Sequence, residues 1–281
     1  MNKKMIGYIL GRVMLVEAAL MLLPVLCGLL YGEREVLAFL LPILLASGAG
    51  AAMYRRKPAN TAIYAREGFC VVAASWVLLS LVGALPFWLC GRELSIWDCI
   101  FETVSGFTTT GASVLANVEA LPKCVLFWRS FTHWIGGMGV LVFILAIAPL
   151  EDNRSLFLMR AEVPGPEVGK LVPRMRETAK ILYGVYSVLT VLLIGLLLLG
   201  GMPLFDSVCN AFGAAGTGGF AIKSAGIAAY NSPYAEMVLA IFMLLFGVNF
   251  NLFYLLMIRR MRPVLKNEEL RWYVLIVLAA V

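Results

Sequence analysis

The sequence predicts an all-α integral membrane protein, and three observations carry that prediction. The chain has 281 residues, of which 61% are hydrophobic and 14% are charged, whereas a soluble domain carries about 25% charged residues. Its mean hydropathy is +0.88. Segments free of Asp, Glu, Lys and Arg approach the ~20 residues that a membrane helix needs, namely 36–53, 68–91, 130–150, 181–205 and 237–258. This composition argues against a water-soluble enzyme.

The first apolar segment, 6–30, has Arg12 and Glu17 as its only charged residues. It is too long for the core of a signal peptide, and no small-residue cleavage site follows, so we expect a retained helix. Inside it, Glu17 is expected to pair with another helix.

Neither the net charge nor the cysteines indicate a further ligand. The net charge is +6, but the basic residues occur in short blocks between apolar segments, which is typical of membrane topology and not of a nucleic-acid-binding face. No C-x-x-C pair and no histidine cluster accompanies the cysteines, which are expected to be single buried thiols without a metal; they are residues 27, 70, 90, 99, 124 and 209.

The basic residues predict the orientation of the chain. With the N-terminus in the cytoplasm, seventeen basic residues lie inside and five outside, as the positive-inside rule requires. The five outside residues are Arg34, Arg92, Lys123, Arg129 and Lys223.

Two apolar stretches on the outer side are too short to span a bilayer. Trp97–Phe107 is followed by Thr-Thr-Thr-Gly, and Leu204–Ala214 is followed by Ala-Gly-Thr-Gly-Gly-Phe. A short apolar stretch between two outer loops predicts a re-entrant half-helix. Two of them in matching positions indicate the transport site.

The two stretches belong to an internal repeat. WDCIFETVSGFTTTGAS (97–113) aligns without a gap with FDSVCNAFGAAGTGGFA (205–221), at an offset that also matches Gly139 with Gly247. The matched pairs within the alignment are Asp98 with Asp206, Thr109 with Thr217, and Gly111 with Gly219. Each unit is therefore predicted to be a helix, a half-helix, a Gly/Thr-rich turn and a second helix.

This unit suits a cation. The negative end of a half-helix dipole would face the pore, and the extended Gly/Thr run after it can present carbonyls that replace the water shell of an ion. Glycines there allow backbone angles that other residues resist; they are Gly111, Gly216, Gly218 and Gly219. The hydroxyls of Thr108, Thr109 and Thr110 can support the turn or face the ion.

Three acidic residues lie in or beside the half-helices. Asp98 and Asp206 are expected to act as N-caps in preference to ion ligands. Glu102 lies one turn after Asp98 and is expected to make an orienting hydrogen bond in the pore wall, with attraction of cations at the mouth as the alternative.

Two helices that follow the half-helices carry polar residues. His133 is expected to pack and hydrogen-bond near the outer interface, with a proton relay as the alternative. Gly136, Gly137 and Gly139 offer a small surface for close helix packing. Asn249 and Asn251 are expected to make an inter-helix hydrogen bond, or to line an inner cavity.

FETVSGFTTTGASVL (101–115) followed by RSFTHWIGGMGVLVFILAIAPL (129–150) resembles the first repeat of the Trk/Ktr potassium uptake family. NAFGAAGTGGFAI (210–222) and GVNFNLFYLL (247–256) resemble its second repeat. The two helices before the first repeat make the likeness closest to the TrkH-type membrane subunit.

The resemblance implies a K⁺-channel-like fold, with four pseudo-symmetric repeats around one potassium pathway. It implies K⁺ ions bound by Thr109, Thr110, Thr217 and Gly218. It further implies a filter whose geometry is set by Thr108, Gly111, Ala112, Gly216, Gly219 and Phe220. It also implies a homodimer in the bacterial inner membrane, a cytoplasmic nucleotide-binding partner of the TrkA type, and no organic cofactor or enzyme activity.

Four parts of the chain follow from this assignment: a two-helix N-terminal pair (1–58), a first pore repeat (66–152), a second pore repeat (178–262), and the start of a third repeat (268–281). The family's later repeats are not contained in these residues, so we expect the chain to be part of a longer protein, unless two halves associate. The function expected is potassium uptake as the conducting subunit; the alternative is a non-conducting half-transporter that assists assembly or regulation. Coupling to H⁺ or Na⁺, as in a symporter, and channel-like flow both stay open.

Overall fold

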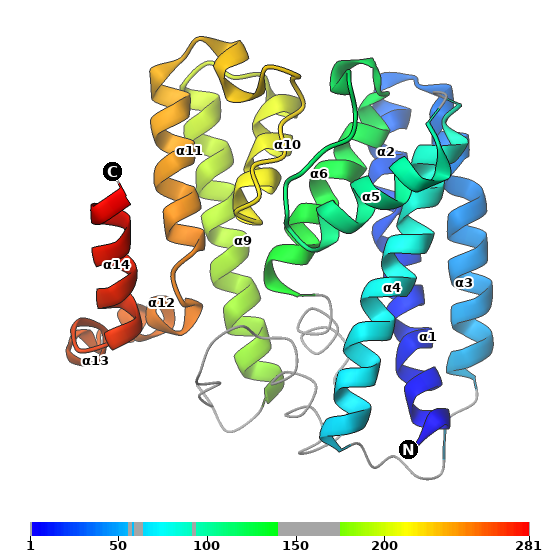
Figure 1. Cartoon of the computed structure of the whole chain (residues 1–281), viewed down its shortest axis with the longest axis horizontal. Coiled ribbons are helices and arrows are strands. Elements are labelled where there is room, and N and C mark those ends of the chain that lie inside the picture. The colour runs from blue at the N-terminus through cyan, green and yellow to red at the C-terminus, as the bar shows by residue number, and fades with distance from the viewer. Residues whose placement is uncertain (1, 56–57, 59–63, 92–93, 140–174, 281) are drawn as a thin grey trace.

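The computed structural model describes residues 2–55, 58, 64–91, 94–139 and 175–280. Throughout these residues every regular element is a helix. The long helices stand roughly side by side, whereas the short α12 and α13 lie across them (Figure 1). The predicted all-α membrane fold is confirmed.

The N-terminal pair consists of two antiparallel spans. The first is α1 (Lys3–Leu20) continued by α2 (Leu22–Tyr31), and the second is η1 (Arg34–Phe39) continued by α3 (Leu40–Tyr54). Gly11 and Gly50 let α1 and α3 approach closely, because a Cβ at Gly11 would lie only 2.9 Å from the Gly50 carbonyl oxygen.

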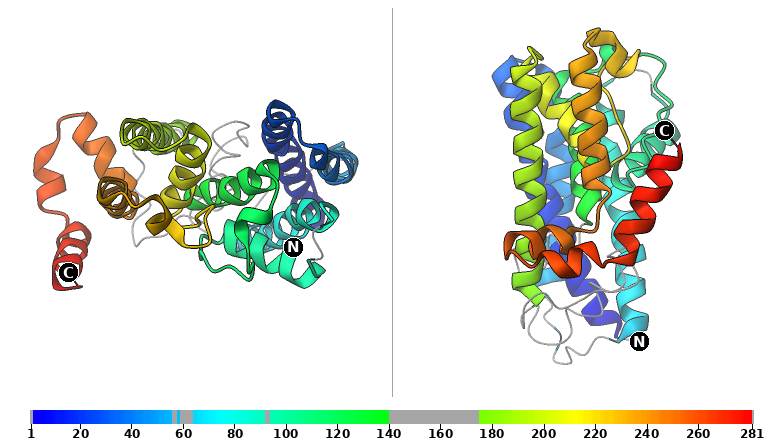
Figure 2. Two further views of the ribbon diagram at one scale, coloured as in Figure 1. Left: turned by 90° about the horizontal axis from the view of Figure 1, so that it is seen from above. Right: turned by 90° about the vertical axis from the view of Figure 1, so that its left-hand side faces the viewer.

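The two repeats contain corresponding helices. The first has α4 (Ala65–Leu89), α5 (Ile96–Phe107), η2 (Val118–Ala120) and α6 (Lys123–Met138). The second has α9 (Met175–Leu199), α10 (Leu204–Ala215), η4 (Gly226–Tyr230) and α11 (Pro233–Phe246). After them come α12 (Phe250–Met257), α13 (Met261–Leu265) and α14 (Glu268–Ala280). Seen from above, the repeats lie beside one another, with α6 next to α10 (Figure 2).

Two predicted helices have different bounds. The helix expected at 130–150 already begins at Lys123 and ends at Met138, because Gly139 has a φ of 80°; residues 140–150 lie outside the described part. The prediction of a single helix over 237–258 was wrong, because this stretch is divided between α11 and α12, which meet at an angle of 91°. α11 ends just before Gly247, which is the counterpart of Gly139 in the repeat.

Four helical segments in the described part are long and apolar enough to cross a membrane, and the bent α11–α12 pair would be a fifth. The four are Lys3–Tyr31, Arg34–Tyr54, Arg66–Leu89 and Ala179–Leu199. The half-helices α5 and α10 lie between such segments, away from the end of the bundle that holds the N-terminus (Figure 1).

Candidate ion-binding site

Both half-helices end inside the bundle. α5 and α10 contain 12 residues each, and at 1.5 Å per residue each is ~18 Å long, too short for a bilayer core of ~30 Å. Their C-terminal ends, at Thr108 and Gly216, therefore bring the negative end of each helix dipole to mid-depth. Most carbonyls of the last turns accept from the amides of the residues that follow, which fixes the path of those residues.

Asp98 takes part in capping the N-terminus of α5. Ser95 is the N-cap, and its hydroxyl accepts from the Trp97 and Asp98 amides at 3.2 and 3.3 Å, while the Asp98 carboxylate accepts from the Ser95 amide at 3.3 Å. The predicted N-cap position was therefore wrong, since Asp98 is the reciprocal partner three residues later.

Asp206 occupies the same position in α10 but has another partner. The N-cap of α10 is Pro203, which makes no side-chain cap bond, so the N-cap prediction was wrong here too. The Asp206 carboxylate accepts from the Tyr230 hydroxyl at 2.8 Å. It thereby fixes the outer loop that contains η4.

The residues after the half-helices have positive φ at the same two positions in both repeats. We name them the first Gly/Thr segment (108–112) and the second Gly/Thr segment (216–220). Thr109 and Thr217 have φ values of 55° and 57°, and Gly111 and Gly219 have 76° and 75°. Positive φ is uncommon for a β-branched residue, and such strain persists where the surroundings enforce it, typically at functional sites.

The two Gly/Thr segments touch each other. A Cβ at Gly111 would overlap the Gly218 carbonyl oxygen, and a Cβ at Gly218 would lie 2.6 Å from the Thr109 carbonyl oxygen. Glycine is therefore required at both positions, which brings backbone carbonyls of the two repeats to one place.

The predicted site residues differ in exposure. Those on the open side are Thr108, Thr110, Ala112, Thr217 and Gly219. Thr109, Gly111 and Gly218 are half-buried, where the segments meet. Gly216 and Phe220 are buried, and the Phe220 ring points away from the open side, against His133 and Arg129.

Hydroxyl groups at the end of α5 hold the first Gly/Thr segment in place. Ser105 donates to the Ala112 carbonyl oxygen at 2.6 Å, and Thr108 donates to the Val104 carbonyl oxygen at 2.7 Å. The hydroxyls of Thr108 and Thr110 lie 2.8 Å apart. These bonds occupy the hydroxyls of Ser105, Thr108 and Thr110 and the carbonyl oxygen of Ala112, and they fix the path of the segment at both of its ends.

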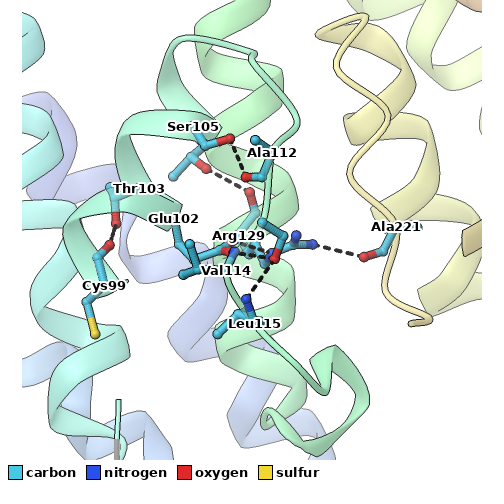
Figure 3. Close-up of polar contacts among 11 residues, drawn as sticks. Cys99, Glu102, Thr103, Ser105, Ala112, Val114, Leu115, Arg129 and Ala221 are labelled. Atoms are coloured by element: carbon cyan, nitrogen blue, oxygen red, sulfur yellow. Dashed lines mark hydrogen bonds and ion pairs between the residues drawn. The ribbon is translucent and has the colours of Figure 1, made fainter. Parts of the chain in front are cut away.

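A buried ion pair lies behind the first segment (Figure 3). Glu102 and Arg129 are 1% and 2% exposed, and Arg129 Nε donates to Glu102 Oε2 at 3.0 Å. The other carboxylate oxygen of Glu102 accepts from the Ser113 hydroxyl and from the Val114 amide, the latter at 2.7 Å. The orienting role expected for Glu102 is confirmed, and its burial leaves no place for it at the mouth.

Arg129 also reaches the second repeat. Its Nη1 donates to the Ala221 carbonyl oxygen at 2.9 Å, and its guanidinium lies 3.6 Å from the centre of the Phe220 ring. Counting Arg129 among the outer basic residues was therefore wrong. The charge count treats every arginine as a surface residue, whereas this one has a buried carboxylate partner 27 residues away.

His133 lies behind the second segment and not at an interface. Its side chain is fully buried, and within the described part neither ring nitrogen has a hydrogen-bond partner. The imidazole centre is 4.1 Å from that of Phe220, and a Cβ at Gly218 would overlap its Nε2. The predicted interfacial position of His133 was therefore wrong. The buried imidazole packs against the second Gly/Thr segment and supports it directly.

The small residues of α6 receive the ends of both half-helices. A Cβ at Gly136 would overlap the Phe107 carbonyl oxygen, and one at Gly137 would lie 3.1 Å from the Ala215 carbonyl oxygen. The close packing expected of these glycines is confirmed.

The two asparagines near the α11–α12 break also have partners. Asn249 caps α12, accepting from the Asn251 amide at 3.0 Å, and its Nδ2 donates to the Glu269 carboxylate of α14 at 3.0 Å. The expected inter-helix hydrogen bond is confirmed for Asn249.

Comparison with known proteins gives concordant matches. The family model TrkH, described as a cation transport protein, matches residues 35–277. The chain is 34% identical over 282 residues to the Trk system potassium uptake protein TrkG of Escherichia coli K12, covering 99% of this chain and 58% of that protein. It is 36% identical over 280 residues to the Trk system potassium uptake protein TrkH of Salmonella typhimurium, covering 98% of this chain and 58% of that protein.

A solved structure has the same fold. The crystal structure of the potassium transporter TrkH from Vibrio parahaemolyticus matches with a TM-score of 0.77 and 30% identity, over 90% of this chain and 52% of that chain. The chain thus spans somewhat more than half the length of the curated relatives that it matches.

Proposed function

This chain belongs to the TrkH family of cation transport proteins, and from that premise we propose that it forms part of the K⁺-conducting subunit of a Trk-type uptake system. The family is a class of transporters and not of enzymes. The carried ion is K⁺, without an organic cofactor.

One observation carries the proposal. Two half-helices from different repeats end at segments with the same pair of positive φ values, at Thr109 and Gly111 and again at Thr217 and Gly219. A residue at positive φ turns its peptide group relative to an extended strand, so successive carbonyls can face one side. Rings of backbone carbonyls are what replaces the water shell of K⁺ in selectivity filters.

We assign the ion contacts to Thr109, Thr110, Thr217 and Gly218. The flanking residues, listed as Thr108, Gly111, Ala112, Gly216, Gly219 and Phe220, would set the filter geometry. Phe220 acts from behind, because its ring is buried against His133 and Arg129. The open side of the two segments is where further filter strands of the complete pathway would lie.

The setting of this subunit is proposed with it. The protein lies in a lipid bilayer, which we take to be the bacterial inner membrane, with the N-terminus inside as the basic residues indicate. It acts as a homodimer and binds a cytoplasmic nucleotide-binding subunit of the TrkA type. The four parts predicted from the sequence remain the proposed domain division.

The test is potassium-dependent growth of an uptake-deficient bacterium that expresses this chain alone or extended past Val281. We expect rescue by the extended form, and loss of K⁺ over Na⁺ selectivity in its Gly111→Ala variant, because a methyl group there overlaps Gly218 and strains a positive φ. Gly184→Ala is the matched control, since nothing lies within 4 Å of its Cβ. Rescue by neither form, or unchanged selectivity in Gly111→Ala, would contradict the proposal.

A further inference from the structure

Glu17 of α1 is buried in an apolar environment. Its side chain is 1% exposed, and both carboxyl oxygens lack a hydrogen-bond partner in the described part of the chain. The pairing with another helix that the sequence suggested is therefore not formed there. An unpaired buried carboxylate is among the most unfavourable groups that a protein interior can hold.

Glu17 lines a small cavity of ≈ 10 Å³, at the lower limit of the room that one water molecule needs. Three further residues of α1 line it, Val13, Val16 and Leu20, and the neighbouring helices contribute Leu79 of α4, Phe107 of α5, and Trp128 and Ile135 of α6. None of these carries a second ionisable group. Among the residues that line this cavity, therefore, no cation and no polar network compensates a charge at Glu17.

The cavity lies directly behind the first half-helix. Phe107 is the last residue of α5, and its ring packs edge-to-face on Trp128 with centroids 6.2 Å apart. Trp128 in turn donates to the Gly83 carbonyl oxygen at 3.0 Å. A Cβ at Gly83 would lie 3.1 Å from the Phe107 ring and 3.4 Å from Glu17 Oε1, so these groups share one tightly packed space.

We propose that Glu17 is a proton-binding site in the membrane interior, which holds its proton while α1 is packed behind α5 and loosens this packing when the proton is lost. The ligand is a proton taken from water. The neutral acid fits an apolar cavity, whereas the carboxylate formed when its proton passes to water must seek solvent. A change of pH would thereby act on the helix that ends at the first Gly/Thr segment.

The test compares the thermal stability of the protein in lipid nanodiscs with that of its Glu17→Gln variant across pH. Folding that favours the protonated acid loses stability as the pH rises, whereas glutamine stays neutral. We expect the variant to melt at the same temperature as the parent at pH values below the unfolded-state pKa of glutamate, about 4.3, and at a progressively higher temperature as the pH rises above it. A variant that melts lower, by a margin that grows with pH, would show an ionised and paired Glu17 and overturn the proposal.

Glu102→Gln is the matched control. That carboxylate is equally buried but is paired with Arg129, so its variant should melt lower than the parent at neutral pH, the opposite sign. Hydrogen exchange gives a second readout: amides of α1 and α5 should exchange faster at alkaline pH in the parent than in Glu17→Gln. Equal exchange in both proteins at every pH would contradict the loosening step.

One further measurement covers the case in which the variant fails to fold. A hydrophobic carbodiimide adds across the O–H bond of a protonated carboxylic acid, and the adduct rearranges to a stable N-acylurea without losing an atom. In mild acid, where the proposal keeps the proton on Glu17, peptide mass spectrometry of the parent protein should find Glu17 modified and Glu102 unmodified. Glu17 modified no more than Glu102 at that pH would overturn the proposal. The readouts are independent of K⁺ transport, so their failure leaves the proposed function untouched.

Discussion

The two Gly/Thr segments have the same backbone but are supported in different ways. Behind the first lies the Glu102–Arg129 ion pair. At the repeat offset, the counterpart of Glu102 is Asn210, which donates to the Tyr230 hydroxyl at 3.3 Å. The counterpart of Arg129 is Met237, whose side chain is 65% exposed. The second repeat thus has no ion pair at the two positions that correspond to Glu102 and Arg129.

The second segment depends instead on the first repeat. Arg129 donates to Ala221 and His133 packs on Phe220, and both residues come from α6. A single buried charge pair therefore positions two segments, while the second repeat contributes backbone and apolar packing. The support is asymmetric although the backbone is repeated, and variants of α6 should affect both segments.

The largest effect is expected from Arg129→Met. It leaves the Glu102 carboxylate buried and unpaired, which costs about 3–5 kcal/mol of unfolding free energy, and it releases Ala221. Unfolding in mixed micelles measures the loss, and adding Glu102→Gln in the same chain should recover part of it. A loss of unfolding free energy below about 1 kcal/mol would contradict the idea that this one ion pair positions both Gly/Thr segments.

His133→Ala should have the next largest effect and should act on the second segment. Removing a fully buried ring leaves a cavity beside Phe220, at a cost of about 2 kcal/mol. Hydrogen exchange should rise at 216–221 more than at 108–113. His133→Phe, which keeps a ring there, should recover most of the stability; equal exchange in both segments would break the comparison.

A smaller effect, confined to the second repeat, is expected from Tyr230→Phe. The variant loses the 2.8 Å hydrogen bond to Asp206 and the 3.3 Å hydrogen bond from Asn210, each worth about 1 kcal/mol. K⁺ selectivity should be unchanged, because the hydrogen-bond partners of the Tyr230 hydroxyl, Asn210 and Asp206, belong to α10 and not to a Gly/Thr segment. Altered selectivity would show that the outer loop takes part in ion binding.

The smallest effect concerns the outer loops. The Ser224 amide and Lys223 hold the pKa of the Glu119 carboxyl below its usual range, with distances of 3.3 Å each. Because the pKa is lower in the folded state, the link is present above the unfolded pKa and is lost as the pH falls through the folded one. The protection of the Ser224 amide, which is its intrinsic exchange rate relative to the observed rate at the same pH, should therefore fall in acid. Glu119→Gln should show that lower protection already at neutral pH.

The sequence predicted what depends on local pattern. The short apolar runs and the matched Asp, Thr and Gly residues were enough for the half-helices and the repeat, because length and spacing alone decide whether a helix spans. The ends of α6 at Met138 and of α11 at Phe246, each followed by a glycine, were missed. Glycine within an apolar run is equally compatible with close helix packing.

The supporting contacts could not be predicted in the same way. Glu102 and Arg129 lie on different helices, and nothing in their spacing indicates that they pair. His133 is surrounded by residues that are equally typical of an interface, and its burial depends on α10 packing against α6. The ion that the two segments bind could not be predicted from residue types either. Ion selectivity depends on the positions of the carbonyl oxygens, and these follow from backbone angles that residue types do not specify.

The most direct test of the account is anomalous diffraction from crystals of the protein soaked in rubidium, a heavier substitute for potassium. We expect one principal ion between the carbonyls of Thr109 and Thr110 on one side and those of Thr217 and Gly218 on the other, displaced by K⁺ and not by Na⁺. Its occupancy should fall in Arg129→Met. Rubidium bound elsewhere, or equal displacement by Na⁺, would contradict the assignment of these segments as the potassium site.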